Sequence, residues 1–309
     1  MTLTLKLSDI ASWGNPDDQQ TAVQKVAIPA LQRGLVWRPK QIELLWDSLM
    51  RGIPIGSFVI CTFIKNQLRK NKNAEYHLLD GQQRANAIQL GFAPFPPKGK
   101  ADSILWLDLA PKDMPKDSSR SFLFRVTTPA HPWGYTKDDS ENTLRAGEIR
   151  KCLEENQIKS PENESYERPN PCEIRPKEAN IPVPFSLVLS CYHENDDLFQ
   201  ESLRQKFKQL ESHYSWAKTA LNALANSEIE LPILVHGINV ALGSRILALQ
   251  APDELLSPSM QEINNDDQTG ITNIEHLFQR LNQQGTRLDG EELIYSMIKN
   301  LSVNNYDLV

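Results

Sequence analysis

Apolar and polar positions over the first 130 residues alternate between short apolar runs and helical spacing. Runs rich in β-branched and aromatic residues predict strands at 26–29, 57–63 and 76–79, and similar runs at 104–109 and 121–126 are expected to extend the same sheet. Apolar residues three or four apart predict a helix that begins at Pro39 and stops near Gly52, and a second that begins near Gly81. This mixture of elements predicts an α+β fold.

The composition changes after residue 155. Residues 156–184 carry repeated prolines among Asn, Glu and Ser, which indicates a linker or a long excursion. Residues 196–225 contain no Gly or Pro and repeat apolar residues at helical steps, which predicts one long amphipathic helix. The run 229–238 then predicts a strand, and 240–250 a helix.

These patterns divide the chain into three parts. We expect a first domain at residues 1–155, a Pro-rich linker or excursion at 156–185, and a mostly helical domain at 186–309 that completes the functional site.

Two predicted helices meet at a glycine near the C-terminus. The first covers residues 274–284 and ends at Gly285, and Asp289 with Glu292 has the pattern of a capping box that starts the second. This turn chemistry does not explain Arg280 and Asn282. By residue chemistry they are either solvated polar residues at a helix end or ligand-binding groups.

Composition and length exclude several classes of protein. The chain has 309 residues, of which 40% are hydrophobic and 23% charged, enough for a sizeable core and two domains. No apolar run is long enough to span a bilayer, and the N-terminal residues lack the layout of a secretion signal. We therefore expect a soluble, cytoplasmic protein with no membrane partner. The four cysteines are scattered, which argues against a zinc site or a disulfide scaffold.

The net charge of −6 conceals an uneven distribution along the chain. Residues 1–100 contain 13 Lys and Arg against 7 Asp and Glu, whereas residues 101–309 contain 20 against 32. The basic N-terminal part favours an anionic ligand there, although some of its lysines lie in a polar loop and are explained equally well as solvated.

The segment from Tyr76 to Arg84 is the most informative part of the sequence. It joins a predicted strand to a predicted helix through Asp80-Gly81-Gln82-Gln83-Arg84. A helix N-terminus presents unpaired backbone N–H groups and a partial positive charge, glycine allows an anion close to the main chain, and arginine binds phosphate through two donors. The segment therefore predicts a phosphate site. The alternative is an Asp80 N-cap followed by a surface arginine.

A second cluster of aromatic residues lies at His131-Pro132-Trp133-Gly134-Tyr135. Trp133 and Tyr135 could stack on a nucleic-acid base. The commoner explanation is a turn whose aromatic side chains close the edge of the core.

Several motifs in a fixed order resemble one known family. They are Leu31-Gln32-Arg33, Trp37-Arg38-Pro39, Pro54-Ile55-Gly56, Leu79-Asp80-Gly81-Gln82-Gln83-Arg84 and Phe278-x-Arg280-x-Asn282-x-x-Gly285-Thr286-x-Leu288. From about residue 26 to 299 the chain resembles the N-terminal domain of GmrSD-type restriction proteins. That family is similar to the ParB and sulfiredoxin superfamily, in which a glycine-led motif ending in arginine binds nucleotide phosphates. The resemblance implies a ParB/sulfiredoxin-like N-terminal domain followed by a mostly helical region.

The resemblance implies an NTP-binding and NTP-hydrolysing regulatory module of a bacterial anti-phage restriction system, acting on DNA that includes modified phage DNA. Its site residues would be of two kinds. Asp80, Gln83 and Arg84 would be catalytic, with Asp80 orienting the loop or a Mg²⁺ ion. Nucleotide contacts would come from Arg33, Gly81, Gln82, Arg280 and Asn282.

Two other functions stay open from the residues themselves. One is a nucleotide-sensing or DNA-binding module without hydrolysis, and the other is a metal-dependent DNA endonuclease. The sequence has no Walker A spacing, and its six histidines form neither a His-Asn-His pattern nor a close His-Asp pair. Since GmrSD-type proteins commonly carry an HNH-type nuclease domain, we expect that activity to come from a further domain or a partner subunit, or to be missing in this member.

Overall fold

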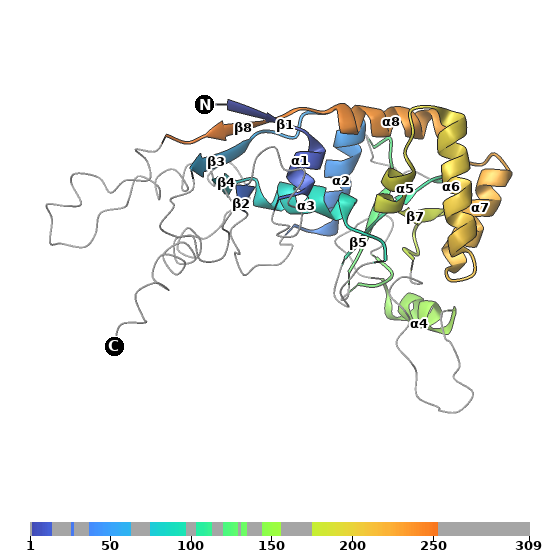
Figure 1. The fold of residues 1–309 in the computed structure, drawn as a ribbon. Coiled ribbons are helices and arrows are strands. Elements are labelled where there is room, and N and C mark those ends of the chain that lie inside the picture. The colour runs from blue at the N-terminus through green and yellow to red at the C-terminus, as the bar shows by residue number, and fades with distance from the viewer. Residues whose placement is uncertain are drawn as a thin grey trace, which may run out of the picture. The chain divides into compact units, whose positions relative to one another are not determined.

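The computed structural model describes residues 2–13, 26–27, 37–62, 75–96, 103–112, 120–128, 131–134, 144–155 and 175–252 (Figure 1). The chain forms two compact units. The first unit comprises residues 1–34, 56–82 and 245–309, and the second comprises residues 35–55 and 83–244. Each unit has its own sheet and at least one helix, so the predicted α+β class is confirmed. Among the described helices, none combines the length and the apolar character needed to cross a membrane.

The first unit is built on a five-stranded sheet with the order β1-β8-β3-β4-β2 (Figure 1). Its strands are β1 (Thr2–Leu5), β2 (Val26–Ala27), β3 (Phe58–Thr62), β4 (Tyr76–Asp80) and β8 (Ile246–Gln250). β8 runs antiparallel to β1 and parallel to β3, while β4 runs antiparallel to β3 and parallel to β2. The strands predicted near 26–29, 57–63 and 76–79 are thus confirmed.

One face of this sheet is the core of the first unit. Side chains from four of its strands are buried on it, namely Leu5, Phe58, Ile60, Leu78, Ile246 and Ala248. Helix α1 (Leu7–Ala11) follows β1 directly, and just after it the ring of Trp13 meets Phe58 edge to face with centroids 5.3 Å apart.

The second unit contains a separate three-stranded antiparallel sheet with the order β6-β5-β7. Its strands are β5 (Ile104–Asp108), β6 (Phe124–Thr127) and β7 (Pro182–Pro184). The strands at 104–109 and 121–126 were expected to extend the first sheet, and that expectation is wrong. All five residues of β5 are buried, so its run of apolar residues has no solvent-facing side to indicate which sheet it joins.

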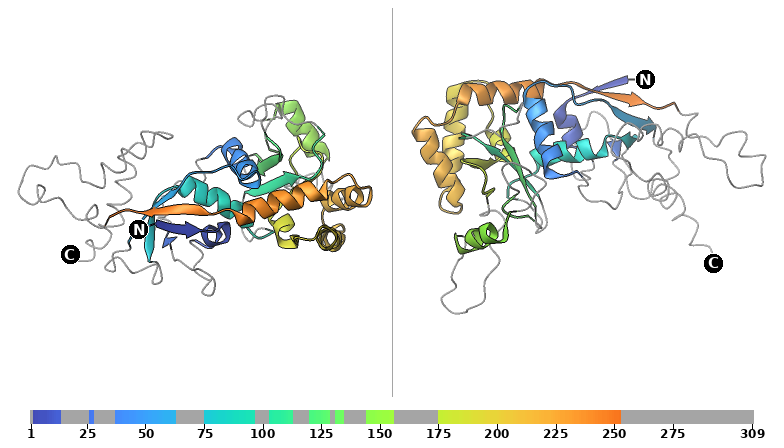
Figure 2. Two further views of the ribbon diagram at one scale, coloured as in Figure 1. Left: turned by 90° about the horizontal axis from the view of Figure 1, so that it is seen from above. Right: turned by 180° about the vertical axis from the view of Figure 1, so that it is seen from behind.

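Helices form most of the remainder of the second unit. They are α2 (Pro39–Met50), α3 (Gln82–Phe92), α4 (Ala146–Glu155), α5 (Phe185–Cys191), α6 (Asp196–Leu210), α7 (Ser215–Ala225) and α8 (Leu231–Gly243). The division between the units falls in the first turn of α3, between Gln82 and Gln83. Both views in Figure 2 show α6 and α7 side by side.

Trp46 of α2 lies at the centre of the second unit and is fully buried. Its ring packs against Phe124 and Phe185, and its indole N–H donates to the carbonyl oxygen of Ala87 in α3 at 2.8 Å. Gly91 of the same helix approaches so closely that a Cβ atom there would lie 2.0 Å from the ring. α2 and α3 are therefore held together by the packing and the hydrogen bond of Trp46.

The region 196–225 forms two helices, α6 and α7, instead of the single helix predicted. Between them Tyr214 is extended, with φ −136° and ψ 122°. Its ring stacks on Trp216 at 5.6 Å and meets Phe95 at 5.5 Å. Tertiary packing of these aromatic residues overrides the helical periodicity that continues through the break.

The strand predicted at 229–238 and the helix predicted at 240–250 are both wrong, because the order is reversed. Residues 231–243 form α8, which starts with a proline in its first turn, and residues 246–250 form β8. α8 is apolar on most sides, so its periodicity is weak. Buried and exposed residues alternate in β8 as in a strand, but its exposed residues Leu247 and Leu249 are also apolar, so the sequence shows no alternation there.

Candidate functional site

The predicted phosphate hinge has the local geometry expected of it. β4 ends at Asp80 and α3 begins at Gln82, so Gly81 alone connects strand to helix. Gly81 has φ +96°, a conformation that L side chains rarely adopt. Gly81 is buried, and the next three residues, Gln82, Gln83 and Arg84, are half-buried. The first-turn N–H groups of an eleven-residue helix follow the glycine directly.

Within the second unit, the first turn of α3 is tied to both ends of α2. The side-chain oxygen of Gln83 accepts a hydrogen bond from the main-chain N–H of Trp37 at 3.3 Å, just before α2. Nη1 of Arg84 donates to the carbonyl oxygen of Ile55 at 3.0 Å, just after α2. Because both partners are main-chain groups, the positions of Gln83 and Arg84 follow from the backbone around α2.

These contacts order the guanidinium of Arg84 before any ligand binds. An arginine that is already held loses less side-chain entropy when it pairs with an oxyanion, and its planar group suits two phosphate oxygens. The turn that holds it is Pro54-Ile55-Gly56, one of the motifs on which the family resemblance rests.

Asp80 lies at the end of β4, where the ladder is irregular. It pairs with Val59 of β3, whereas Ile60 pairs with Leu78, so the register shifts by one residue between the two pairs. Such bulges commonly redirect a side chain near a functional site. Asp80 is half-buried and is the predicted metal ligand.

The described residues contain no group of three or more His, Cys, Asp or Glu side chains arranged to hold a metal ion. A single carboxylate such as Asp80 fits Mg²⁺ in one way, because protein sites for this ion commonly use one or two carboxylates together with phosphate oxygens of the substrate. The donor set is therefore compatible with an ion that arrives with a nucleotide.

Three predicted site residues, Arg33, Arg280 and Asn282, lie outside the described residues. Of the others, Gln83 and Arg84 are brought together at α2, and Asp80, Gly81 and Gln82 form the connection from β4.

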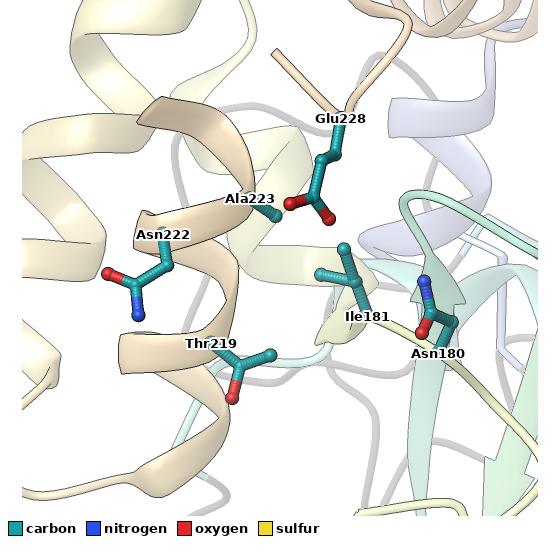
Figure 3. Close-up of a pocket in the computed structure, with 6 residues that line it drawn as sticks. All are labelled: Asn180, Ile181, Thr219, Asn222, Ala223 and Glu228. Atoms are coloured by element: carbon teal, nitrogen blue, oxygen red, sulfur yellow. The ribbon is translucent and has the colours of Figure 1, made fainter. Parts of the chain in front are cut away.

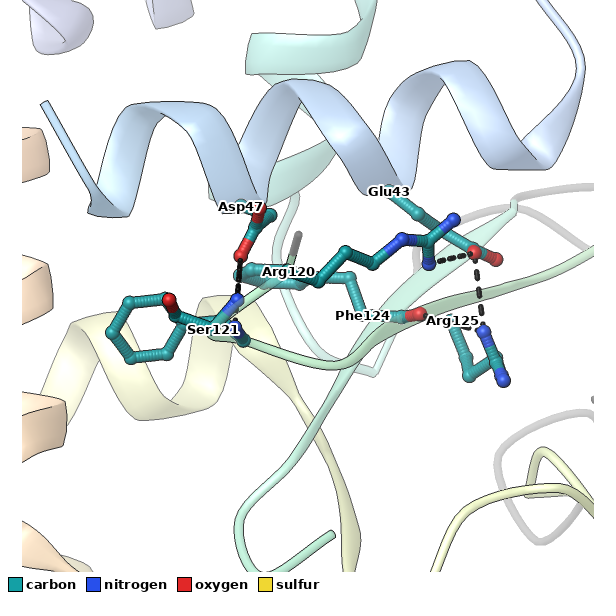
Figure 4. A network of polar contacts seen from close by, with 7 residues as sticks. Glu43, Asp47, Arg120, Ser121, Phe124 and Arg125 are labelled. Carbon is teal, nitrogen blue, oxygen red and sulfur yellow. Dashed lines mark hydrogen bonds and ion pairs between the residues drawn. The ribbon is translucent and has the colours of Figure 1, made fainter. Parts of the chain in front are cut away.

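Sequence reasoning missed a buried ionic cluster in the second unit (Figure 4). One carboxylate oxygen of Glu43, in α2, accepts from Nη1 of Arg120 and from Nη1 of Arg125, each at 3.3 Å. Glu43 is 1% exposed and Arg125 4%. Burial raises the pKa of Glu43, and the charges of Arg125 and Arg120 oppose that rise.

Asp47, one helical turn further along α2, is also buried. Its Oδ1 accepts from the main-chain N–H groups of Ser121 and Phe122, both at 2.8 Å (Figure 4). Its Oδ2 lies 3.2 Å from Nη1 of Arg51. Asp47 thus fixes the chain that enters β6. The available signal in the sequence was two carboxylates four residues apart beside the apolar face of a helix.

At the aromatic cluster the structure supports the core explanation for Trp133. This side chain is 8% exposed and packs with Leu144, Ile149 and Cys152. The turn before it is closed by hydrogen bonds between Thr128 and His131. Tyr135 lies outside the described residues.

A small cavity of about 200 Å³ opens beside α7 (Figure 3). It is lined by Asn180, Ile181, Thr219, Asn222, Ala223 and Glu228. The Asn180 amide donates to the carbonyl oxygen of Ala110, and a carboxylate oxygen of Glu228 accepts from Asn226. The lining includes no residue of the predicted site.

Fold and hinge together define an α+β protein in which a glycine connection opens a helix that carries a fixed arginine in its first turn. Residues 17–299 match the family described as GmrSD restriction endonuclease, N-terminal domain, and the chain belongs to that family. No curated protein matches the chain. The family suggested by the ordered motifs is therefore confirmed, and its restriction-system context with it, whereas the likeness to ParB and sulfiredoxin stays a prediction.

Proposed function

We propose that this chain binds a nucleoside triphosphate at Gly81–Arg84 and serves as the NTP-hydrolysing regulatory module of an anti-phage DNA restriction system. One observation carries the proposal: a glycine with φ +96° lies directly before α3, and Arg84 in the first turn of that helix is held by the Ile55 carbonyl. Membership of a restriction-endonuclease family supports the DNA context.

Each residue of the hinge has a distinct proposed task. The N–H groups of Gly81 and Gln82 bind phosphate oxygens, and Arg84 offsets their charge. Asp80 orients the loop and would hold Mg²⁺ together with the phosphates; the ion would supply positive charge close to the phosphate oxygens.

Gln83 is the third proposed catalytic residue. Its amide lies in the first turn of α3 and accepts from the Trp37 N–H, which supports a role for it beside the phosphate group that Arg84 would bind. From the remainder of the chain, Arg33, Arg280 and Asn282 are proposed to complete the nucleotide contacts. DNA and an HNH-type nuclease, in a further domain or a partner subunit, are the proposed partners.

Equilibrium binding of the four NTPs with Mg²⁺, combined with phosphate release, tests the proposal. Both are measured with plain DNA, with modified DNA and without DNA. The decisive comparison is between Arg84→Ala and Arg204→Ala, because Arg204 is an exposed arginine of α6 whose charge is matched but whose position is remote in sequence.

We expect Arg84→Ala to lose triphosphate affinity and Arg204→Ala to keep it. Equal affinity in wild type and Arg84→Ala, with both folded, would overturn the site. Binding without phosphate release would instead support the nucleotide-sensing alternative.

A further inference from the structure

The two faces of the five-stranded sheet in the first unit differ in what they expose. Residues that pair directly across neighbouring strands share a face. Val59 of β3 lies opposite Asp80 of the hinge, at the point where the register of the β3–β4 pair shifts. Leu249 of β8 pairs with Thr2 on one side and with Val59 on the other, so these three residues share a face. We call this the outward face.

The outward face is apolar at its centre. Leu247 is 48% exposed and Leu249 43%, although β8 lies between β1 and β3 in the interior of the sheet. On the opposite face of the same strand, Ile246 and Ala248 are buried. Single exposed leucines are ordinary on protein surfaces, but two neighbours on an interior strand indicate a surface that another apolar element covers.

The chain itself supplies a candidate to cover it. β8 ends at Gln250, and residues 251–309 follow it in the sequence. The sequence from 274 to 281 has apolar residues at the helical spacing i, i+3, i+4 and i+7, at Ile274, Leu277, Phe278 and Leu281. At about 100° per residue these four form one stripe.

The two unexplained polar residues occupy the borders of that stripe. On the same helical projection, Arg280 falls beside Leu277, and Asn282 falls on the opposite border, beside Phe278. Side chains on the borders of a docked helix reach the surface on which the stripe rests.

We infer that the amphipathic helix predicted at 274–284 docks its apolar stripe on the outward face at Leu247, Leu249 and Val59. Docking there brings Arg280 or Asn282 towards Val59, the pairing partner of Asp80. The connecting residues, at about 3.3 Å each when extended, easily span the sheet. That these side chains then touch a nucleotide rests on the proposed function, whereas the docking itself does not.

Disulfide trapping in the full chain tests the docking. Leu249→Cys is paired with Leu277→Cys in the stripe, in a Cys172→Ser background whose other native cysteines, Cys61, Cys152 and Cys191, are buried. Two cysteines join when their Cβ atoms come within about 4.5 Å. One control pair replaces Leu277 by Gln279→Cys, which lies outside the stripe. A second control pair replaces Leu249 by Leu198→Cys, which lies on α6 and is 54% exposed.

We expect the Leu249–Leu277 pair to form an intramolecular disulfide roughly tenfold faster than either control pair, because docking raises the effective concentration of the two thiols. The bond is read by mobility on a non-reducing gel and by peptide mass. Equal rates in all three pairs would overturn the inference, and so would disulfide-linked dimers, which would show that a second copy covers the face.

The assay also separates this inference from the proposed function. Trapping is measured without nucleotide and again in the Arg84→Ala background. The trapping result therefore does not depend on whether Arg84 binds a triphosphate.

Discussion

Nη1 of Arg84 donates to the carbonyl oxygen of Ile55 at 3.0 Å, which joins the first turn of α3 to the turn that follows α2. The contact connects two motifs that are far apart in the sequence. It explains why a Pro-Ile-Gly turn accompanies the Asp-Gly-Gln-Gln-Arg segment, because the turn presents the carbonyl that orients the arginine.

Replacing Arg84 by alanine should weaken triphosphate binding roughly tenfold or more, since a charge-assisted hydrogen bond contributes about 1.5–3 kcal/mol. Loss of the Ile55 contact should lower the unfolding free energy by about 1 kcal/mol, the usual contribution of one such bond. Isothermal titration calorimetry and urea denaturation measure the two effects. Arg84→Lys keeps the charge but not the planar guanidinium group, so its affinity for the triphosphate should lie between those of wild type and Arg84→Ala. A large loss of stability with unchanged affinity would make Arg84 a structural residue.

The buried Glu43 should make stability depend on pH. Its pKa in the folded chain is raised above the ordinary value of 4.5, so the folded state binds this proton more tightly than the unfolded state. The stabilising contribution is therefore fully present below pH 4.5 and is lost as pH rises through the folded pKa. Between pH 8 and 4.5, wild type should gain stability relative to Glu43→Gln as the pH falls.

Urea denaturation at a series of pH values measures that difference. Glu201→Gln is the matched control, because Glu201 also pairs with an arginine but is 49% exposed. A wild-type advantage that grows with rising pH would show that the arginine charges outweigh burial at Glu43.

The packing of α2 against α3 predicts a strong effect at Gly91. A Cβ atom there would lie 2.0 Å from the ring of Trp46, which is fully buried and cannot move aside freely. Gly91→Ala should cost at least about 1–3 kcal/mol of unfolding free energy. Gly147→Ala in α4 is the control, since its added methyl meets nothing within 4 Å and should be neutral or stabilise by up to about 1 kcal/mol. Thermal denaturation of both variants decides the point.

The parts of the fold that the sequence predicts well are those with local signals. Pro39 and Gly52 bound α2 through their own backbone preferences, and Gly81 marks the hinge for the same reason. The break between α6 and α7 at Tyr214 is not predicted, because the extended conformation of this residue depends on contacts with the rings of Phe95 and Trp216. No local sequence pattern encodes those contacts.

The candidate site shows the same division between local and distant information. Gly81 and Arg84 are recognisable because helix-end chemistry acts within a few residues. The Ile55 carbonyl that orients Arg84 lies 29 residues away from it in the sequence. Glu43 is separated from Arg120 by 77 residues and from Arg125 by 82. Pairings over such distances are decided by tertiary packing.

Replacing Arg280 or Asn282 should lower activity without lowering the thermal stability of the chain. Arg280→Ala and Asn282→Ala are expected to lose NTP turnover, or the response to DNA, while the Tm stays near that of wild type, because polar residues on the border of a helix add little to the core. Gln279→Ala, outside the apolar stripe, is the control. Wild-type turnover in both variants would remove these residues from the site.

The chain tested alone should not cut DNA, even where it binds and hydrolyses nucleotide. Its six histidines form neither a His-Asn-His pattern nor a close His-Asp pair, the arrangements by which a ββα-metal nuclease activates water against a phosphodiester. Plasmid nicking is measured with Mg²⁺ or Mn²⁺ and each NTP, on plain and modified DNA. Nicking that a point substitution abolishes would locate a nuclease centre within this chain and would replace the regulatory role proposed for it. Nicking that survives Arg84→Ala and Asp80→Asn would further show that such a centre works independently of the phosphate hinge.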